Sequence, residues 1–386
     1  MCLYPRLIKN PKYKENKKNG GVIPAFLDER VLAVPIGCGE CIECRKQKRR
    51  NWQVRLLEEV KERTDGIFVT LTFSNERFKK YARRHKKLKG YNLDNAIATE
   101  AVKHFLENWR KEHKKSVRHW LVTELGHNGT ENIHLHGIIW TKEDAQKIRK
   151  HWKNGFVWLG NQNSYGQITN YVNEKTVNYI IKYITKIDEQ HKAYQPKILC
   201  SKGIGAGYMK RSDWENAKYK ENGKTKETYI SSQGFKMAMP IYYRNKIYSE
   251  EEREKLWIEK LDKEERWVCG EKVSIKGNEY EEYNKLRDWY REKSKRLGYG
   301  NGEMKWSLKK YEEERRELLH RKRLGKDETE DAHCREAREA FALDDTRFAR
   351  KTLMRKDWQE EWEYNGTIWH GDEPDWVNES GMIVSW

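Results

Sequence analysis

The sequence predicts an α+β fold in which an antiparallel sheet carries a split βαβ motif and a charged, mainly helical region follows. Three observations predict it. Segments between residues 67 and 160 read strand, helix, strand, strand, helix, strand, an order typical of this motif with its helices on one face. The glycine-containing turn at 126–129 favours a hairpin between the second and third strands. From about Ser249, alternating charges with sparse Trp, Tyr and Leu indicate solvated helices.

The length and composition indicate two or three domains. The chain has 386 residues, of which 37% are hydrophobic and 36% charged, so the core is modest. We expect a cysteine-containing basic segment (residues 1–60) packed on a core (residues 61–248). A charged accessory region (residues 249–386), without a motif for chemistry, would follow.

The charge is distributed unevenly along the chain. The formal net charge is +18, yet residues 251–386 contain 29 Lys and Arg against 34 Asp and Glu. Residues 1–250 therefore contain 49 against 26. A basic region with many Trp and Tyr suits a nucleic acid, because basic side chains displace counterions and aromatic rings stack on unpaired bases. A basic protein without a nucleic-acid partner is the alternative.

The sequence predicts a cytoplasmic protein. No apolar run approaches the roughly 20 residues that span a bilayer, and residues 1–5 lack the apolar region of a signal peptide. We therefore expect no membrane partner, and cysteines that stay reduced rather than forming disulfides.

A cysteine cluster lies near the N-terminus. Cys38, Cys41 and Cys44 recur at three-residue intervals among glycines, and thiolates at this spacing can surround one tetrahedral zinc. The fourth ligand would be Cys2, with Cys200 as the second choice. Free structural thiols are the alternative to a zinc site.

The elements that follow are predicted by periodicity and punctuation. Residues 45–57 indicate a basic helix and residues 67–73 a strand, followed by a basic loop at 79–89. Asp94 then caps a helix with a near-helical apolar repeat. The apolar positions of this helix are Ile97, Ala101, Phe105 and Trp109.

The remaining elements of the sheet lie between residues 117 and 160. Two strands, 117–124 and 132–140, precede a short helix at 144–152 and a short strand at 156–160. The glycine-rich segment 202–208 is interpreted as a plain turn, and phosphate contact is the alternative.

The third strand carries a His-Leu-His sequence. Side chains alternate along a strand, so His134 and His136 share one face about 7 Å apart, with Gly137 leaving room beside them. Glu124, on the hairpin-linked strand, completes a two-histidine, one-carboxylate site with open positions, which suits Mg²⁺ or Mn²⁺. His127, in the turn, ranks below Glu124 as a ligand. The alternative is two histidines on a solvated strand face.

A helix over residues 174–186 carries paired tyrosines. Its apolar stripe is complete without Tyr179 and Tyr183, which lie on the opposite side with Lys182 and Lys186. A neighbouring ammonium stabilises a phenolate, and a metal that withdraws charge from a phosphodiester eases nucleophilic attack. Tyrosines packed in the core are the alternative.

These motifs together resemble the HUH endonucleases that initiate rolling-circle replication, and among them the initiators of gokushovirus-type microviruses, which are small single-stranded-DNA phages. The resemblance covers roughly residues 1–245 and departs from the motif name because leucine stands between the histidines. The segments that carry it are residues 1–5, the cysteine cluster, residues 68–73, Glu124 with residues 134–136, and residues 179–183.

The resemblance implies a fold and a chemistry. The core would be HUH-like, related to the ferredoxin and RRM folds. His134, His136 and Glu124 would hold Mg²⁺ or Mn²⁺ at the scissile phosphate of single-stranded origin DNA. Tyr179 or Tyr183 would attack it, giving a 5′-phosphotyrosine and a free 3′-OH.

The resemblance also implies partners and the completion of a cycle. Host polymerase would extend the 3′-OH, helicase and polymerase being the host partners expected, in the bacterial cytoplasm. The second tyrosine would cut the regenerated origin, and religation would close the displaced strand. Lys182 and Lys186 would stabilise the phenolate or the developing charge.

Two other functions remain open from the sequence. A single-tyrosine transposase or plasmid relaxase would need only one of the two tyrosines. A non-catalytic, zinc-stabilised nucleic-acid-binding protein would need neither the tyrosines nor the histidines.

Overall fold

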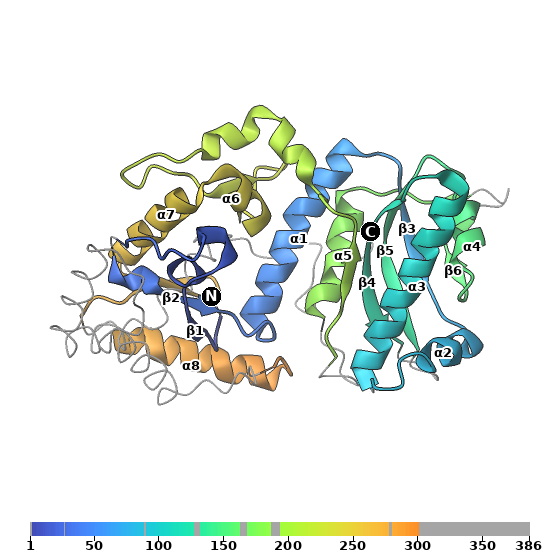
Figure 1. Cartoon of the computed structure of the whole chain (residues 1–386), viewed down its shortest axis with the longest axis horizontal. Helices are drawn as coiled ribbons and strands as arrows, with labels where there is room; N and C mark the ends of the chain where they lie inside the picture. Colours follow the sequence, from blue (N-terminus) through green and yellow to red (C-terminus); the bar gives the residue numbers. More distant parts are fainter. Residues whose placement is uncertain are drawn as a thin grey trace. The chain divides into compact units, whose positions relative to one another are not determined.

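The computed structural model describes residues 2–26, 28–88, 90–126, 132–162, 168–186, 194–277 and 280–300. The described chain forms two compact units (Figure 1). One contains the described residues up to Gln47 and from Glu215 to Gly300, and the other contains those from Lys48 to Trp214. These units divide the chain at other residues than its composition does, and the composition-based domains stay a prediction. Among the described residues, no helix combines the length and apolarity that crossing a bilayer requires.

The unit from Lys48 to Trp214 is built on an antiparallel sheet. Among its described residues five strands pair in the order β6-β3-β5-β4-β9, every neighbouring pair antiparallel. Strands β3 and β4 are therefore parallel, with β5 between them, which is the split βαβ arrangement. The predicted α+β fold is confirmed. The strands are β3 (Gly66–Leu71), β4 (Arg118–Leu125), β5 (Ile133–Trp140), β6 (Val157–Trp158) and β9 (Ile198–Cys200).

One face of this sheet packs on α2 (Asn75–Ala82), α3 (Gly90–His113) and α4 (Gln146–Trp152). The strands contribute Leu71, Leu121, Leu135 and Ile139, none of them measurably exposed. The helices contribute the predicted apolar positions Ile97, Ala101, Phe105 and Trp109, together with Ile148 and Trp152. Full burial of such a side chain stabilises the fold by about 1.5–3 kcal/mol, so this layer holds the sheet in place.

The segment between β3 and α3 differs from its prediction. We expected a basic loop at 79–89, but its first residues belong to α2, whose N-cap Ser74 accepts a hydrogen bond from the Arg77 backbone. Of the residues of α2 only Tyr81 is buried, so the helix lacks a long apolar stripe. Helix α3 begins at Gly90 rather than after Asp94.

Helices cover the opposite face as well, so the expectation of helices on one face is wrong. The half of α1 (Ile42–Glu62) that belongs to this unit places Trp52 against Trp120 of β4, with ring centroids 5.8 Å apart. Helix α5 (Glu174–Thr185) places Tyr183 against His136 of β5. Figure 1 shows α5 and α3 on opposite sides of β4 and β5. The predicted basic helix at 45–57 is confirmed by α1.

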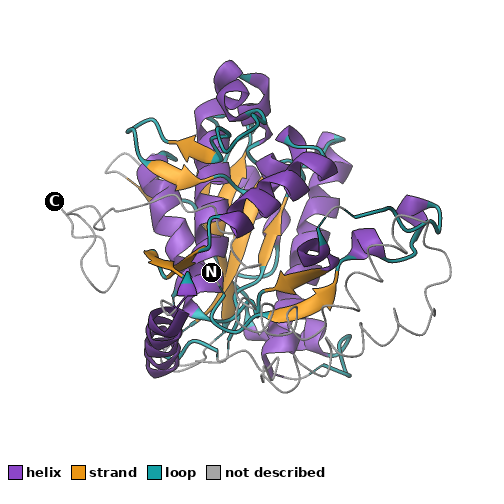
Figure 2. Ribbon diagram, turned by 90° about the vertical axis from the view of Figure 1, so that its left-hand side faces the viewer, coloured by secondary structure: helices purple, strands orange, loops and turns teal. Residues whose placement is uncertain are grey.

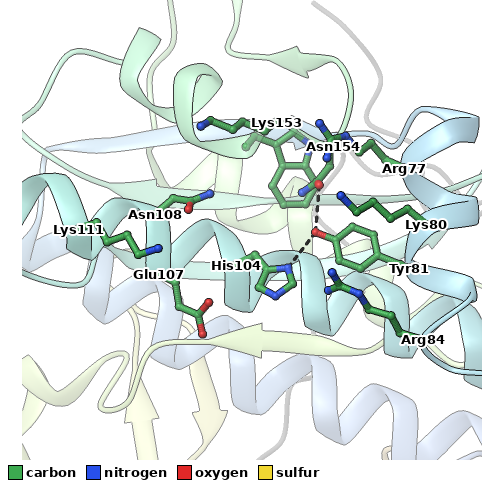
Figure 3. Close-up of a pocket in the computed structure, with 11 residues that line it drawn as sticks. Arg77, Lys80, Tyr81, Arg84, His104, Glu107, Asn108, Lys111, Lys153 and Asn154 are labelled. Carbon is green, nitrogen blue, oxygen red and sulfur yellow. Dashed lines mark hydrogen bonds between the residues drawn. The ribbon is translucent and has the colours of Figure 1, made fainter.

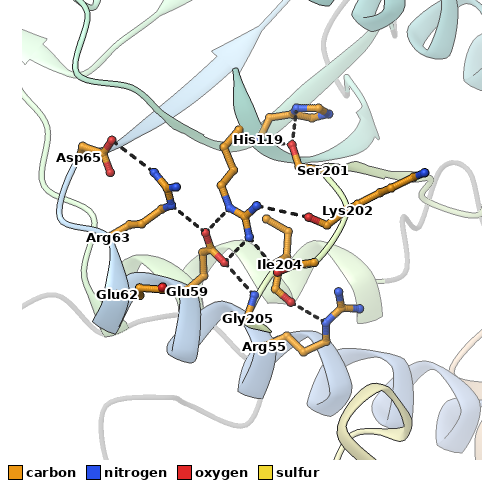
Figure 4. A network of polar contacts seen from close by, with 12 residues as sticks. Arg55, Glu59, Glu62, Arg63, Asp65, His119, Ser201, Lys202, Ile204 and Gly205 are labelled. Atoms are coloured by element: carbon orange, nitrogen blue, oxygen red, sulfur yellow. Dashed lines mark hydrogen bonds and ion pairs between the residues drawn. The ribbon is translucent and has the colours of Figure 1, made fainter. Parts of the chain in front are cut away.

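A buried carboxylate fixes the glycine-rich loop to α1 (Figure 4). Glu59 has no measurable exposure, and its carboxylate accepts hydrogen bonds from Arg118 and from the backbone N–H of Gly205, the latter at 2.7 Å. Arg118 also donates to the Gly203 carbonyl at 2.8 Å, and Arg63 lies 3.4 Å from the carboxylate. The loop is therefore a fixed part of the fold rather than a plain turn.

The other unit also mixes helices and strands, as Figure 2 shows by colour. Where we expected solvated helices, helices α7 and α8 flank a two-stranded hairpin. The helix α8 packs Tyr283 against Val268 and the cysteine-containing N-terminus. The predicted acidic, Trp-rich tail lies outside the described residues.

The elements of this unit are short. They are β1 (Arg6–Lys9), β2 (Ala33–Ile36), β10 (Thr228–Ile230), β11 (Lys236–Ala238), α6 (Ile241–Ile247), α7 (Glu250–Asp262), β12 (Glu265–Val268), β13 (Glu271–Ser274) and α8 (Tyr280–Arg296). The pairs β1–β2, β10–β11 and β12–β13 are each antiparallel.

We expect Glu59→Ala to lower the free energy of unfolding by about 3 kcal/mol, because it leaves the Arg118 guanidinium and a buried N–H without their acceptor. Urea denaturation followed by circular dichroism measures the change. Glu62→Ala, which removes a partly exposed carboxylate paired with Lys210 one turn along α1, should cost about 1 kcal/mol or less. Equal losses in the two variants would contradict this role of Glu59.

Candidate active site

Two imidazoles and a carboxylate converge on one face of the sheet. The β4–β5 register places Glu124 directly opposite His134, and alternation puts His136 on the same face. The Nε2 atoms of His136 and His134 lie 2.9 and 3.3 Å from Oε2 of Glu124. The donor atoms of all three lie within 4.8 Å of one another. The structure thus brings together the three residues that the sequence predicts as metal ligands; His127 lies outside the described residues.

The other ring nitrogen of each histidine is also in contact. Nδ1 of His136 lies 3.0 Å from the Thr70 hydroxyl on β3, and Nδ1 of His134 lies 3.3 Å from the Asn132 carbonyl. An Nδ1–H that donates to oxygen leaves Nε2 as the lone-pair donor toward a metal. Both histidines are therefore oriented with Nε2 toward Glu124.

Gly137 has a steric reason to lack a side chain. A Cβ at this position would lie 2.1 Å from the Trp120 carbonyl oxygen and 2.7 Å from a methyl group of Leu121. Strand β4 could not approach β5 this closely with any other residue there. The predicted backbone room beside the histidines is thus occupied by the neighbouring strand.

The electrostatics favour the forms that ligate a cation. Burial raises the pKa of Glu124, but hydrogen bonds with His134, His136 and Lys186 outweigh it and hold that pKa well below its usual range. Burial lowers the pKa of His136, although contact with Glu124 opposes this. An ionised carboxylate beside a neutral imidazole is the donor set that a divalent cation requires, so the residues fit Mg²⁺ or Mn²⁺.

Helix α5 carries the tyrosines to this site. It starts with a capping box in which Asn173 and Thr176 exchange hydrogen bonds, and this cap sets the phase of the helix. The Tyr183 ring stacks on the His136 ring, with centroids 4.5 Å apart and planes 7° apart. Its hydroxyl donates to the Tyr179 hydroxyl at 2.9 Å. The two phenols therefore meet beside the imidazoles.

The two tyrosines have different surroundings. Tyr183 is only 6% exposed, and burial, together with the hydrogen bond to Tyr179, raises its pKa well above the usual range. Tyr179 is half-buried, and the Lys182 ammonium lies 3.8 Å from its ring centroid. The same ammonium is 5.1 Å from the Tyr183 ring.

The two predicted lysines contact different groups. Lys182 lies over the tyrosine rings, as predicted for a cation that stabilises a phenolate. Lys186 forms an ion pair with Oε1 of Glu124 at 2.8 Å, on the carboxylate oxygen that faces away from the imidazoles. The Lys186 ammonium is 6.0 Å from the Tyr183 ring.

Two site residues were missed in the sequence. Phe68 and Thr70 were recognised only as strand residues. Phe68 stacks on His136 at 6.3 Å on the face opposite Tyr183, and its ring meets Tyr179 edge-on at 5.8 Å. The signal was the β3–β5 pairing, which places Thr70 opposite His136, and a single sequence does not state this register.

The N-terminal cysteines gather into a second candidate metal site, in the other unit. The sulfur atoms of Cys2, Cys38, Cys41 and Cys44 lie within 4.8 Å of one another. Backbone N–H groups donate to two of these sulfurs, those of Cys2 and Cys38. Hydrogen bonds from the neighbouring thiols and the backbone lower the pKa of Cys38. Four convergent thiols suit a tetrahedral zinc.

The choice of the fourth cysteine favours the first prediction. Cys2 is part of the cluster, whereas Cys200, the second choice, lies on β9 of the unit from Lys48 to Trp214. Gly37 lies against the cluster, where a Cβ would be 3.1 Å from the Cys44 sulfur.

A third cluster of metal-binding residue types joins Glu112 to His113 and His151. Its carboxylate already contacts two ammonium groups, those of Lys147 and Lys150, each at 2.6 Å. These cations offset the charge that a metal would need, so the cluster is explained as an ion-pair network between α3 and α4.

Residues 66–188 match a family model described as a replication-associated protein of the ORF2 type. The matched segment is about a third of the chain, and it contains every predicted catalytic and metal-binding residue of the sheet and α5. It excludes the cysteine cluster. The match supports a role in the initiation of replication and hence DNA as a partner. Searches of curated proteins and of solved structures found no significant match.

If the four thiols bind zinc, purified protein contains about one zinc ion per chain by mass spectrometry of metals. Cys44→Ser should lose that zinc and lower the melting temperature, because metal binding adds to folding free energy. Cys200→Ser, the matched control, should keep both. Zinc-free protein with an unchanged melting temperature would leave the free-thiol interpretation.

For a cation held by Nε2 of His136, Thr70→Val should weaken Mn²⁺ binding about tenfold, because the hydroxyl that orients the ring is lost. Calorimetric titration with Mn²⁺ measures it. Thr72→Val is the control: its hydroxyl donates to the Phe156 carbonyl instead of a histidine, and it should bind Mn²⁺ as the unmodified chain does. Equal weakening in both would argue against the orienting role.

Proposed function

We propose that this chain is a replication initiation endonuclease of the HUH type, which nicks single-stranded origin DNA through a tyrosine and later rejoins the strand. The observation that carries the proposal is the pair of hydrogen-bonded phenols stacked beside a two-histidine, one-carboxylate cluster. The match of residues 66–188 to a replication-associated family supports the same function.

Each part of the site has a role in this reaction. Glu124, His134 and His136 would hold Mg²⁺ or Mn²⁺, which would withdraw charge from the scissile phosphate. The attacking phenol loses its proton and forms a bond from its oxygen to phosphorus. The bond from phosphorus to the 3′ oxygen breaks, and that oxygen takes up a proton to give the 3′-OH. The 5′-phosphotyrosine conserves the phosphodiester energy, so rejoining needs no ATP.

Tyr179 is the better candidate for the first attack. It accepts the hydrogen bond that Tyr183 donates, and a donor at this position stabilises negative charge on the Tyr179 oxygen. Lys182 lies nearest to its ring. Tyr183 is buried with a raised pKa, which disfavours its ionisation before DNA binds. Tyr183 would then make the second cut, when the origin has been regenerated.

The lysines take separate roles in this proposal. Lys182 would stabilise the phenolate and the developing charge on the phosphorus oxygens. Lys186 would position the carboxylate of Glu124 through its ion pair rather than act on a phenol. The cycle further requires a host polymerase and helicase, and the cytoplasm of a bacterial host if the chain comes from a phage.

Incubation with labelled single-stranded DNA and Mn²⁺ should yield a covalent protein–DNA adduct on a denaturing gel. Tyr179→Phe should lower the first-cleavage rate on the order of a thousandfold, because the nucleophile is lost. Tyr183→Phe should form the adduct but fail to release a closed circle. Chelation of divalent cations should abolish cleavage in all variants.

The same assay separates the other functions. A single-tyrosine transposase or relaxase predicts that one Tyr→Phe variant completes the whole cycle. A non-catalytic zinc-stabilised binding protein predicts no adduct under any metal, and DNA binding that His134→Ala leaves unchanged. Either outcome would refute the proposed two-tyrosine cycle.

A further inference from the structure

A basic cavity lies on the sheet face opposite the histidines (Figure 3). It has a volume of about 270 Å³ and is bounded by α2, α3 and the segment after α4. Five cationic side chains line it, against a single carboxylate, that of Glu107. The cationic side chains are Arg77, Lys80, Arg84, Lys111 and Lys153.

Most of these cations are not neutralised by a neighbour. Arg84 pairs with Glu100 at 2.7 Å. The other four form no ion pair within the part of the chain that the structure describes. Concentrating like charges around one cavity costs free energy, and an anion held among them would offset that cost. The cavity therefore suits an anionic ligand.

The base of the cavity supplies a polar anchor. Asn154 is 5% exposed, and its Oδ1 accepts a hydrogen bond from the Tyr81 hydroxyl at 3.1 Å. Its Nδ2 donates to no group in the described structure, and Asn154 lines the cavity. An amide donor without a partner on a buried side chain is costly, and an anionic oxygen would satisfy it. A phosphate oxygen has both the charge and the acceptor capacity.

An exposed aromatic side chain follows the cavity directly in the sequence. Phe156, two residues after Asn154, is 65% exposed. Gly155 between them lies so close to β3 that a Cβ would be 2.5 Å from the Thr72 carbonyl oxygen, so this segment is fixed against the sheet. An exposed ring beside a cationic cavity is the arrangement that binds unpaired bases together with their backbone phosphates.

The cavity lies at the same end of the sheet as the histidines. Asn132, whose carbonyl contacts His134, donates its side-chain amide to Asn75 at 2.8 Å. Asn75 is the first residue of α2, the helix that carries Arg77 and Lys80 of the cavity. A strand leaving the candidate active site therefore needs only to pass this end of the sheet to reach the cavity.

We propose that the cavity is a second binding site for single-stranded DNA, which takes a backbone phosphate of the strand that extends beyond the scissile position while Phe156 stacks on a base. The proposal deepens the proposed function and rests on it for the identity of the polymer.

Fluorescein-labelled oligo(dT) of increasing length, added to the full chain, tests this by fluorescence anisotropy at several salt concentrations. Two triple variants are compared, each removing three cations of one unit. The cavity variant is Arg77→Gln, Lys80→Gln and Lys111→Gln, and the control variant is Lys115→Gln, Lys142→Gln and Lys202→Gln. The control residues are exposed and lie at the other end of the sheet.

The affinity of the unmodified chain should rise with oligonucleotide length until the strand reaches the cavity. The cavity variant should match the unmodified chain on short DNA and lose the gain on long DNA. Its dependence of log affinity on log salt should be shallower by about 2, since each lost phosphate contact removes about 0.7. The control variant should keep the length-dependent gain.

The aromatic contact has its own variants. Phe156→Ser should weaken binding of long oligo(dT) about tenfold and leave short oligo(dT) unaffected, because one base loses its stacking partner. Phe156→Tyr should restore the affinity, since it keeps the ring. Circular dichroism confirms that each variant is folded.

Three results would overturn the proposal: equal losses in the cavity and control variants, no effect of Phe156→Ser at any length, or affinity for long DNA unchanged in the cavity variant. Binding of inorganic phosphate or deoxynucleoside monophosphate, abolished in that variant while DNA affinity stays unchanged, would assign the cavity to a small molecule. Adduct formation is scored separately, so a chain that shows the length effect without an adduct refutes the nicking and keeps the second site.

Discussion

The pairing of β4 with β5 is the constraint on which the candidate site depends. It sets Glu124 opposite His134, and the strict alternation of side chains then brings His136 to the same face. A slip of one residue would send the carboxylate to the apolar face, where Leu121 and Leu135 pack against the helices. Burial of that face therefore fixes the register, and the stability of the core and the geometry of the three ligands have a common cause.

The second constraint is the phase of α5. Its capping box fixes where the helix begins, and its apolar side chains fill the interior while the two phenols meet over His136. Phe68 and Tyr183 hold the His136 ring between them. This packing restricts the ring to one orientation, so the site gains preorganisation from aromatic contacts as well as from the hydrogen bond to Thr70.

The two faces of the sheet divide the work of the unit. One face is closed by α3 and α4 with a continuous apolar core, and the other carries polar and aromatic groups beneath α5. The basic cavity forms where α2 and α3 leave the core at the end of the sheet. A strand of DNA bound at both places would contact the unit on either side of one sheet edge, which would spread the phosphate contacts over rigid elements.

Local pattern in the sequence was sufficient for the strands, for α3 and α5, and for the ligands and tyrosines, because alternation and helical spacing act over a few residues. Helix α2 escaped it, since a short helix that buries only Tyr81 has no apolar period. Tertiary structure alone decided that helices cover both faces, that Lys186 pairs with Glu124, and that Thr70 and Phe68 contact His136. These are contacts between residues more than 60 positions apart, and they depend on strand order and register, which no local propensity encodes.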